Sequence, residues 1–341
     1  MGTYDHCSNA RFVASETLTT AAVAPVMHTP VESEHSSQES LGYDPFAPEA
    51  CGFRPLNPLC SDTQQELLPG SSRVGTRYIL LEYTGSWSHD IFDGETFTPE
   101  ETMRLQTLPH MYLLRKPGRE GHAEKLEWNA YIVFCDEAIV EHAMIQSRDE
   151  LFALDFSAPG KNQDRGFSIL DEPVLLICTH AKRDRCCAIK GRPIAKTLVH
   201  ANPKAHIWEC SHTKGHRFAP SMVLFPWGYY YGRLNAHASQ DVYSHASNDQ
   251  LFLPGNRGRG IWDAKGQVAE IAVREYLYEL GEQPSINSVR VVDSTVVLAD
   301  GRQFEVTLEY QEVSGVIPSC GADAKQKQSW VATAIKPVSM E

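Results

Sequence analysis

The chain has 341 residues, a formal net charge of −12 and 42% hydrophobic residues, which suffices for two modest domains with packed cores. An acidic chain repels phosphate, so no nucleic-acid partner is expected. The sequence contains no run of about 18 apolar residues, so no membrane partner is expected either. Its start shows no basic segment followed by an apolar one, and we therefore predict a cytoplasmic protein.

Composition divides the chain into four predicted segments. Residues 1–71 are rich in proline and polar residues and are expected to be loosely ordered. Residues 72–165 are predicted to form a divergent N-terminal α/β domain, and residues 166–282 an α/β domain of thioredoxin-like kind. Residues 283–341 are predicted to form a C-terminal β-hairpin extension, with a loose polar tail from Ser319.

In the first domain, apolar and β-branched runs predict strands at 77–83, 110–118 and 129–136. The segment 136–145 is expected to begin as the end of a strand and to continue as a helix. A strand followed by a polar loop occurs both here, at 77–90, and at 173–187 in the second domain, which hints at an internal repeat.

In the second domain, the continuous apolar run VLLIC at 174–178 is typical of a central strand. The other expected elements are a helix at 191–201 with Pro193 in its first turn, strands at 205–212, 221–228 and 229–235, and a helix at 261–281 ended by Gly281. The glycine-rich residues 255–260 are expected to form a loop before that helix. Asp300-Gly301 predicts a hairpin turn in the C-terminal extension.

The cysteines indicate metal binding or redox chemistry rather than a secreted disulfide framework. They number nine and stand at positions 7, 51, 60, 135, 178, 186, 187, 210 and 320. An odd number without a secretory signal argues against paired disulfides. Cys135 stands alone in an apolar run, so we expect it to be a buried small hydrophobe.

Four residues in two loops form the main candidate site. Cys178 ends the apolar strand and Cys187 follows in the pattern C-x8-C, while His212 and His216 form H-x3-H after the next predicted strand. Because both loops should leave the same edge of one sheet, four ligands from two loops can converge there.

This pattern, with CTHAKRDRCCAIKGRPIA, WECSHTKGHRFAP and YYYGRLN, resembles the sucrase/ferredoxin-like family, most specifically between about 171 and 281. The resemblance implies a thioredoxin-like ferredoxin domain with a [2Fe-2S] cluster, one iron held by Cys178 and Cys187 and the other by His212 and His216. The family motif H-x-G-G-H has Lys214 in place of its first glycine here, which puts the loop geometry in question.

Several residues near the motif have open or supporting roles. Cys186 has the wrong register for a ligand, whereas Cys210 and His180 remain alternatives. Arg183, Arg185, Lys214 and Arg217 would stabilise a reduced cluster and steer an acidic redox partner, and Trp208 would shield the site from water.

Ligation by two thiolates and two neutral imidazoles leaves an oxidised cluster near neutrality. Its potential should therefore lie above the roughly −400 mV of all-cysteine ferredoxins and should fall as the pH rises. The predicted function is one-electron transfer, by an electron carrier rather than a stand-alone enzyme. The alternatives are a structural Cys2His2 zinc site, although C-x8-C is long for one, and thiol redox chemistry, although no C-x-x-C is present.

Overall fold

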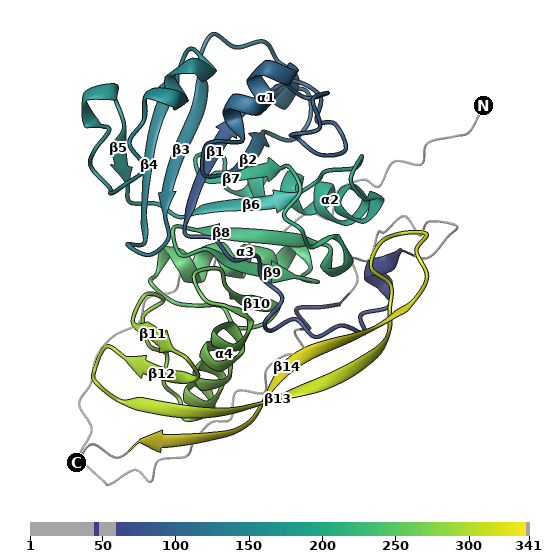
Figure 1. Cartoon of the computed structure of the whole chain (residues 1–341), viewed down its shortest axis with the longest axis vertical. Helices are drawn as coiled ribbons and strands as arrows, with labels where there is room; N and C mark the ends of the chain where they lie inside the picture. Colours follow the sequence, from purple (N-terminus) through teal and green to yellow (C-terminus); the bar gives the residue numbers. More distant parts are fainter. Residues whose placement is uncertain (1–43, 48–58, 339–341) are drawn as a thin grey trace, which may run out of the picture. The chain divides into compact units, whose positions relative to one another are not determined.

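The structure is a computed structural model that describes residues 44–47 and 59–338, all within one compact unit that begins at Asp44 (Figure 1). Most of the segment predicted to be loosely ordered, 1–71, lies outside the described residues. The described residues from Leu59 on begin with a short 3-10 helix, η1 (Cys60–Asp62), followed by an irregular segment with a turn at Pro69-Gly70 that leads into the first strand.

The described residues contain a ten-stranded sheet with helices, which confirms the predicted α/β class (Figure 1). The strands are β1 (Arg77–Glu82), β2 (His110–Arg115), β3 (Trp128–Phe134), β4 (Ile139–Ile145), β5 (Ser168–Leu170), β6 (Val174–Cys178), β7 (His206–Cys210), β8 (Ser221–Phe225), β9 (Tyr229–Gly232) and β10 (Asn256–Arg259). Their order across the sheet is β10-β9-β8-β6-β7-β2-β1-β3-β4-β5. The helices are α1 (Pro99–Leu105), α2 (Arg185–Ala201), α3 (Ala236–Ser247) and α4 (Ala264–Glu279).

The sheet consists of two halves with the same topology. In the first half β1 is parallel to β2 and antiparallel to β3, which pairs with β4. In the second half β6 is parallel to β7 and antiparallel to β8, which pairs with β9. A short antiparallel pairing of β2 with β7 joins the halves. The loops after β1 and β6 therefore occupy equivalent places, in agreement with the repeat that their sequences suggest.

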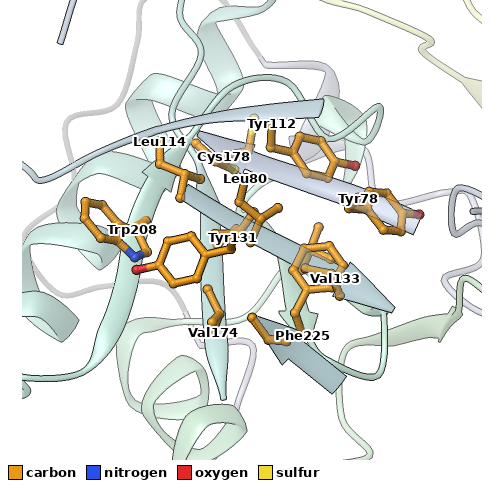
Figure 2. Packing of buried hydrophobic residues seen from close by; sticks show 14 of the residues in the cluster. Tyr78, Leu80, Tyr112, Leu114, Tyr131, Val133, Val174, Cys178, Trp208 and Phe225 are labelled. Carbon is orange, nitrogen blue, oxygen red and sulfur yellow. The ribbon is translucent and has the colours of Figure 1, made fainter. Parts of the chain in front are cut away.

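The two halves fold over each other and enclose a shared apolar layer (Figure 2). The hydroxyl oxygens of Tyr78 in β1 and Tyr230 in β9 lie 3.3 Å apart, although four strands separate β1 from β9 in the sheet order. A flat sheet would hold these strands roughly 24 Å apart. The sheet must therefore bend at the β2–β7 junction, and Cys178 lies within the enclosed layer.

Helices cover the opposite faces of the two halves. Ile194 and Leu198 of α2 and Val242 of α3 pack on the second half, and Leu105 of α1 packs on the first. Strand β6 is buried along its whole length, as expected for VLLIC. This arrangement fixes the ends of β6 and β7 between a helical layer and the enclosed apolar layer.

A second sheet has the order β11 (Val289–Val292), β12 (Thr295–Leu298), β13 (Gln303–Val316) and β14 (Lys325–Val338), and it packs on α4. The predicted turn at Asp300-Gly301 connects β12 to β13. The prediction of a loose tail from Ser319 is wrong, because β14 pairs along β13 and Trp330 stacks on Tyr310 at 3.6 Å. None of the residues in β14 is fully buried, and its first half is rich in polar residues, so its composition resembles that of a tail.

Other expected elements differ in extent or type. Residues 139–145 form the strand β4 rather than a helix, because the tight turn at Ala138 returns the chain along β3. Residues 256–259 form the edge strand β10, not a loop. Helix α2 begins at Arg185, so Pro193 lies inside it. The end of α4 at Gly281 is as predicted, with a left-handed φ of 80°.

Candidate metal centre

The two motif loops leave the same edge of the sheet. Strands β6 and β7 are parallel, and their last residues, Cys178 and Cys210, are register partners. Residues 179–184 then lead into α2, while residues 211–215 lead to the short helix η5 (His216–Phe218). The parallel pairing thus places both loops side by side, as the sequence pattern predicted.

Cys178 and Cys187 are fully buried. Cys187 lies in the first turn of α2, whose N-cap is Asp184; the Asp184 carboxylate accepts a hydrogen bond from the Cys186 amide at 2.9 Å. The N-terminal end of a helix favours negative charge on a nearby thiol. The loop after β6 therefore brings a second sulfur back to the end of the strand.

His212 joins these cysteines directly. Donor atoms of Cys178, Cys187 and His212 all lie within 4.8 Å of one another, with Cys178 Sγ 3.9 Å from His212 Nδ1. His216 lies behind His212, with its Nδ1 3.4 Å from His212 Nε2. The structure thus brings all four predicted residues together, three in a compact group and the fourth in contact with it.

The second imidazole has defined outer partners. Nε2–H of His216 donates to the carbonyl oxygen of Pro318 at 2.6 Å and lies 3.8 Å from the Asp184 carboxylate. These contacts leave Nδ1 facing His212. Burial lowers the pKa of His216, although Asp184 and the Pro318 carbonyl oppose this; burial thus favours the neutral ring, which has a lone pair for a metal.

The pKa values of the two buried thiols, Cys178 and Cys187, shift in opposite directions. Burial alone would raise the pKa of Cys178, but hydrogen bonds from Cys187 and His212 outweigh it and hold the pKa well below the ordinary value. The hydrogen bond to Cys178 and burial raise the pKa of Cys187 well above it. These opposite directions favour loss of one proton from the pair over loss of both, and a bound cation would stabilise the resulting negative charge.

Lys214, which stands where the family motif has glycine, adopts a backbone conformation typical of glycine. Its φ is 59°, in the left-handed region that glycine adopts without strain. The following Gly215 is tightly enclosed, because a Cβ there would lie 2.4 Å from Arg257 Nη1, so a larger residue would displace the Arg257 side chain. The lysine at this position is therefore strained, and the loop still brings His212 and His216 together.

The predicted basic residues each have a specific neighbour. Arg183 Nη1 lies 3.2 Å from His89 Nδ1, and Lys214 Nζ lies 3.4 Å from Asp90. Arg217 pairs with Glu66, and Arg185 hydrogen-bonds to Cys320. Arg183 and Lys214 therefore link the site to the loop after β1.

Trp208 and the alternative ligands lie close by. Trp208 is buried in the shared apolar layer, with the Lys116 ammonium 4.0 Å from its ring centre. Cys210 is fully buried, and burial raises the pKa of its thiol. His180 Nε2–H donates to the Ser88 carbonyl at 2.5 Å, and its Nδ1 has no hydrogen-bond partner within the described residues. Neither Cys210 nor His180 belongs to the compact donor group.

Some neighbours of the site were missed from the sequence. Asp184 could have been recognised as a helix N-cap, since an aspartate before a helix is a common start signal. The contact of Pro318 with His216 had no signal in the sequence, because 102 residues separate the two.

A pocket opens beside His212, between the two halves. Its volume is about 460 Å³, and its lining includes Ile91, Phe92, His110, His180 and Lys214. The loops after β1, β6 and β7 all contribute to its lining. The His212 side of the site is therefore reachable from solvent.

None of the helices in the described part of the chain is both long and apolar enough to cross a bilayer. Searches of curated proteins and of solved structures gave no match. The family model described as sucrase/ferredoxin-like matches residues 68–259, which include both halves of the sheet and all four residues of the site. The chain therefore belongs to the sucrase/ferredoxin-like family.

Proposed function

We propose that the protein is a one-electron carrier whose [2Fe-2S] cluster is held by Cys178, Cys187, His212 and His216 on a thioredoxin-like scaffold. The observation that carries the proposal is the convergence of two buried thiols and two imidazoles from two adjacent loops in a family member. The strand order β9-β8-β6-β7, with α2 crossing from β6 to β7, supports a thioredoxin-like arrangement of the second half.

The donor set fits two metal atoms better than one. A tetrahedral zinc ion needs all its ligands within about 4 Å of one another, because its bonds to nitrogen and sulfur are only about 2.0–2.3 Å long. His216 lies outside the group in which Cys178, Cys187 and His212 are mutually within 4.8 Å. One tetrahedral ion held by all four residues, which is the zinc alternative, therefore does not fit this donor set.

A [2Fe-2S] cluster supplies reversible uptake of one electron at this place. The protein residues set the conditions for it. Cys178 and Cys187 are fully buried and belong to the apolar layer, whereas His212 and His216 keep some exposure to solvent, 13% for the His216 side chain. The hydrogen bond to Pro318 orients the His216 ring and makes its nitrogen a better donor. We infer that electrons enter and leave on the histidine side.

The partner is proposed to be an electron donor or acceptor with an acidic docking surface. Lys182, Arg183 and Lys214 lie around the loops on the outer side of the site. An exposed cationic rim raises the association rate of an acidic protein without adding much affinity. The described cysteines are all free thiols, a state that persists in a reducing compartment such as the cytoplasm.

The proposal is tested by iron analysis, absorption and electron paramagnetic resonance of protein purified without oxygen. We expect about two irons per chain, visible absorbance, and a resonance on reduction. His212→Cys and His216→Cys should each lower the midpoint potential and weaken its dependence on pH, because a thiolate adds negative charge and removes the outer N–H. His237→Cys, on the exposed side of α3, is the matched control and should change neither.

Three results would contradict the proposal. They are a colourless protein with zinc at Cys178 and Cys187, a thiol–disulfide exchange activity that depends on Cys178 in iron-free protein, and a resonance and potential unaffected by both motif substitutions.

A further inference from the structure

A second group of sulfur atoms lies beside the candidate centre and is not part of it. Cys186 is vicinal to Cys187 but points the other way: its Sγ lies 3.4 Å from Cys60 Sγ and 3.3 Å from Cys320 Sγ. The Asp184 carboxylate completes the group, and donor atoms of all four residues lie within 4.8 Å of one another. Cys60, Cys186 and Asp184 are buried, and Cys320 is partly buried.

These four residues come from three remote parts of the chain. Cys60 belongs to η1, Asp184 and Cys186 to the start of α2, and Cys320 to the loop between β13 and β14. Figure 1 shows the yellow tip of the β13–β14 hairpin beside the purple η1, and the Cys60 amide donates to Cys320 Sγ at 3.4 Å. The three sulfur atoms therefore meet although Cys186 is 126 residues from Cys60 and 134 residues from Cys320 along the chain.

We propose that Cys60, Cys186, Cys320 and Asp184 bind one Zn²⁺ ion, separately from the Cys178–His216 centre. Zinc prefers tetrahedral thiolate, imidazole and carboxylate ligands. With Zn–S bonds of about 2.3 Å, the sulfurs on one ion lie about 3.8 Å apart. The sulfur atoms here are already at nearly that spacing, so small outward movements would admit an ion. A cluster of several irons would spread its ligands further.

The surroundings supply what a thiolate-rich zinc site needs. Three thiolates and one carboxylate give a bound Zn²⁺ site a net charge of −2, and Arg185, hydrogen-bonded to Cys320, offsets part of it. Amide groups already donate to the ligands: that of Cys320 to Asp184 Oδ2 at 3.0 Å, and that of Cys60 to Cys320 Sγ. Such hydrogen bonds orient ligands before the metal binds.

The proposed zinc would fasten the hairpin tip over the candidate centre. Pro318, two residues before Cys320, accepts the hydrogen bond from His216 Nε2, and Asp184 lies 3.8 Å from the same nitrogen. Binding at Cys320 would therefore hold Pro318 in place. A structural metal that joins three segments also adds its binding free energy to folding.

The test measures zinc and iron together in the full chain, purified without oxygen. We expect about one zinc per chain in addition to any iron. Cys320→Ser, a substitution in a partly exposed loop, should lower zinc content at least tenfold and leave iron content unchanged, and Cys60→Ser should do the same. Cys135→Ala, at a buried thiol far from both groups along the chain, is the control and should keep zinc. Replacing zinc with Co²⁺ should give the absorption of a thiolate-bound tetrahedral ion, lost in Cys320→Ser.

The result does not depend on the proposed electron-carrier function. If the Cys178→Ser and His212→Ala variants lose iron but keep zinc, the two metal sites are separate. If the wild-type protein contains no iron but still binds zinc through Cys320, only the electron-carrier proposal is overturned. The zinc proposal is overturned if zinc is absent, if it is lost with Cys178 rather than Cys320, or if mass spectrometry finds a disulfide between two of the three cysteines.

Discussion

Lys214 shows how one residue keeps a loop geometry that its chemistry disfavours. A left-handed conformation costs a residue with a Cβ roughly 1 kcal/mol, which glycine avoids. The side chain gains little in return, because its ion pair with Asp90 is half exposed on both sides and such pairs contribute little. The position is therefore under strain that the surrounding loop imposes.

We predict that Lys214→Gly raises the free energy of unfolding by up to about 1 kcal/mol, since it removes this strain. Metal content should stay the same, because the backbone conformation is unchanged. Urea denaturation measures the effect. Lys214→Ala is the control: it removes the ion pair and keeps the Cβ, so a gain in stability from alanine equal to that from glycine would contradict the explanation.

At the scale of one residue, His142 makes the stability of the fold depend on pH. Burial and the nearby His206 lower its pKa to about 4, and its Nε2–H donates to Asn129 Oδ1 at 2.8 Å. The folded state thus favours the neutral ring, whereas the unfolded chain takes up a proton near pH 6.5. Stability should therefore fall as the pH drops from about 6.5 to 4, by no more than about 2 kcal/mol once solvent screening is included.

His142→Gln keeps a hydrogen-bond donor and removes the titration. Its free energy of unfolding should fall less steeply over the same pH range, although burial also lowers the pKa of His206 and His110, which contribute in the same direction. Denaturation curves at pH 7, 5.5 and 4.5 compare the two proteins. Equal slopes would show that His142 is not the titrating group.

Among the elements, α2 packs closely against the sheet at Gly191. A Cβ at Gly191 would lie 2.2 Å from the carbonyl oxygen of Cys178, so the glycine lets α2 approach the end of β6. The contact sets how far Cys187, at the start of the helix, lies from Cys178, at the end of the strand. The helix–strand distance and the site geometry are therefore coupled.

We predict that Gly191→Ala destabilises the protein by about 2 kcal/mol or more, through forced displacement of backbone, although alanine is intrinsically the better helix former by about 1 kcal/mol. Metal content at Cys178 and Cys187 should fall as well. Lys196→Ala, on the exposed face of α2, should change stability by less than about 0.5 kcal/mol. Calorimetry and metal analysis give both readouts, and a neutral or stabilising Gly191→Ala would contradict the close-packing explanation.

At the scale of the whole molecule, a buried ion pair connects the two halves of the sheet. Arg115 of β2 donates to Glu209 of β7 at 3.1 Å, and Thr179, in the loop after β6, donates to the same carboxylate. The Arg115 guanidinium also lies 4.0 Å from the ring of Trp87, in the loop after β1. This junction therefore links both strands to the loop after β6, which carries part of the candidate centre, and to the loop after β1.

We predict that Glu209→Gln lowers the free energy of unfolding by about 3 kcal/mol, because it leaves the charge of Arg115 buried without its partner. Asp149→Asn breaks the exposed pair with Arg104 and should cost less than about 0.5 kcal/mol. Chemical denaturation followed by fluorescence and circular dichroism measures both. Equal effects of the two variants would show that the junction pair is no more important than a surface contact.

The sequence by itself determined the local elements and one constellation. Apolar runs located β1, β2, β3 and β6, and the spacing of Cys178, Cys187, His212 and His216 placed the candidate site at one sheet edge, because these signals lie within neighbouring segments. The tertiary structure decided the rest: the bend of the sheet at β2–β7, the pairing of β14 with β13, and the meeting of Cys60 and Cys320 with Cys186. Contacts between residues more than a hundred positions apart depend on how the two halves of the sheet and the β13–β14 hairpin pack together. The hydrophobic periodicity of the sequence reports only local structure and therefore cannot predict such contacts.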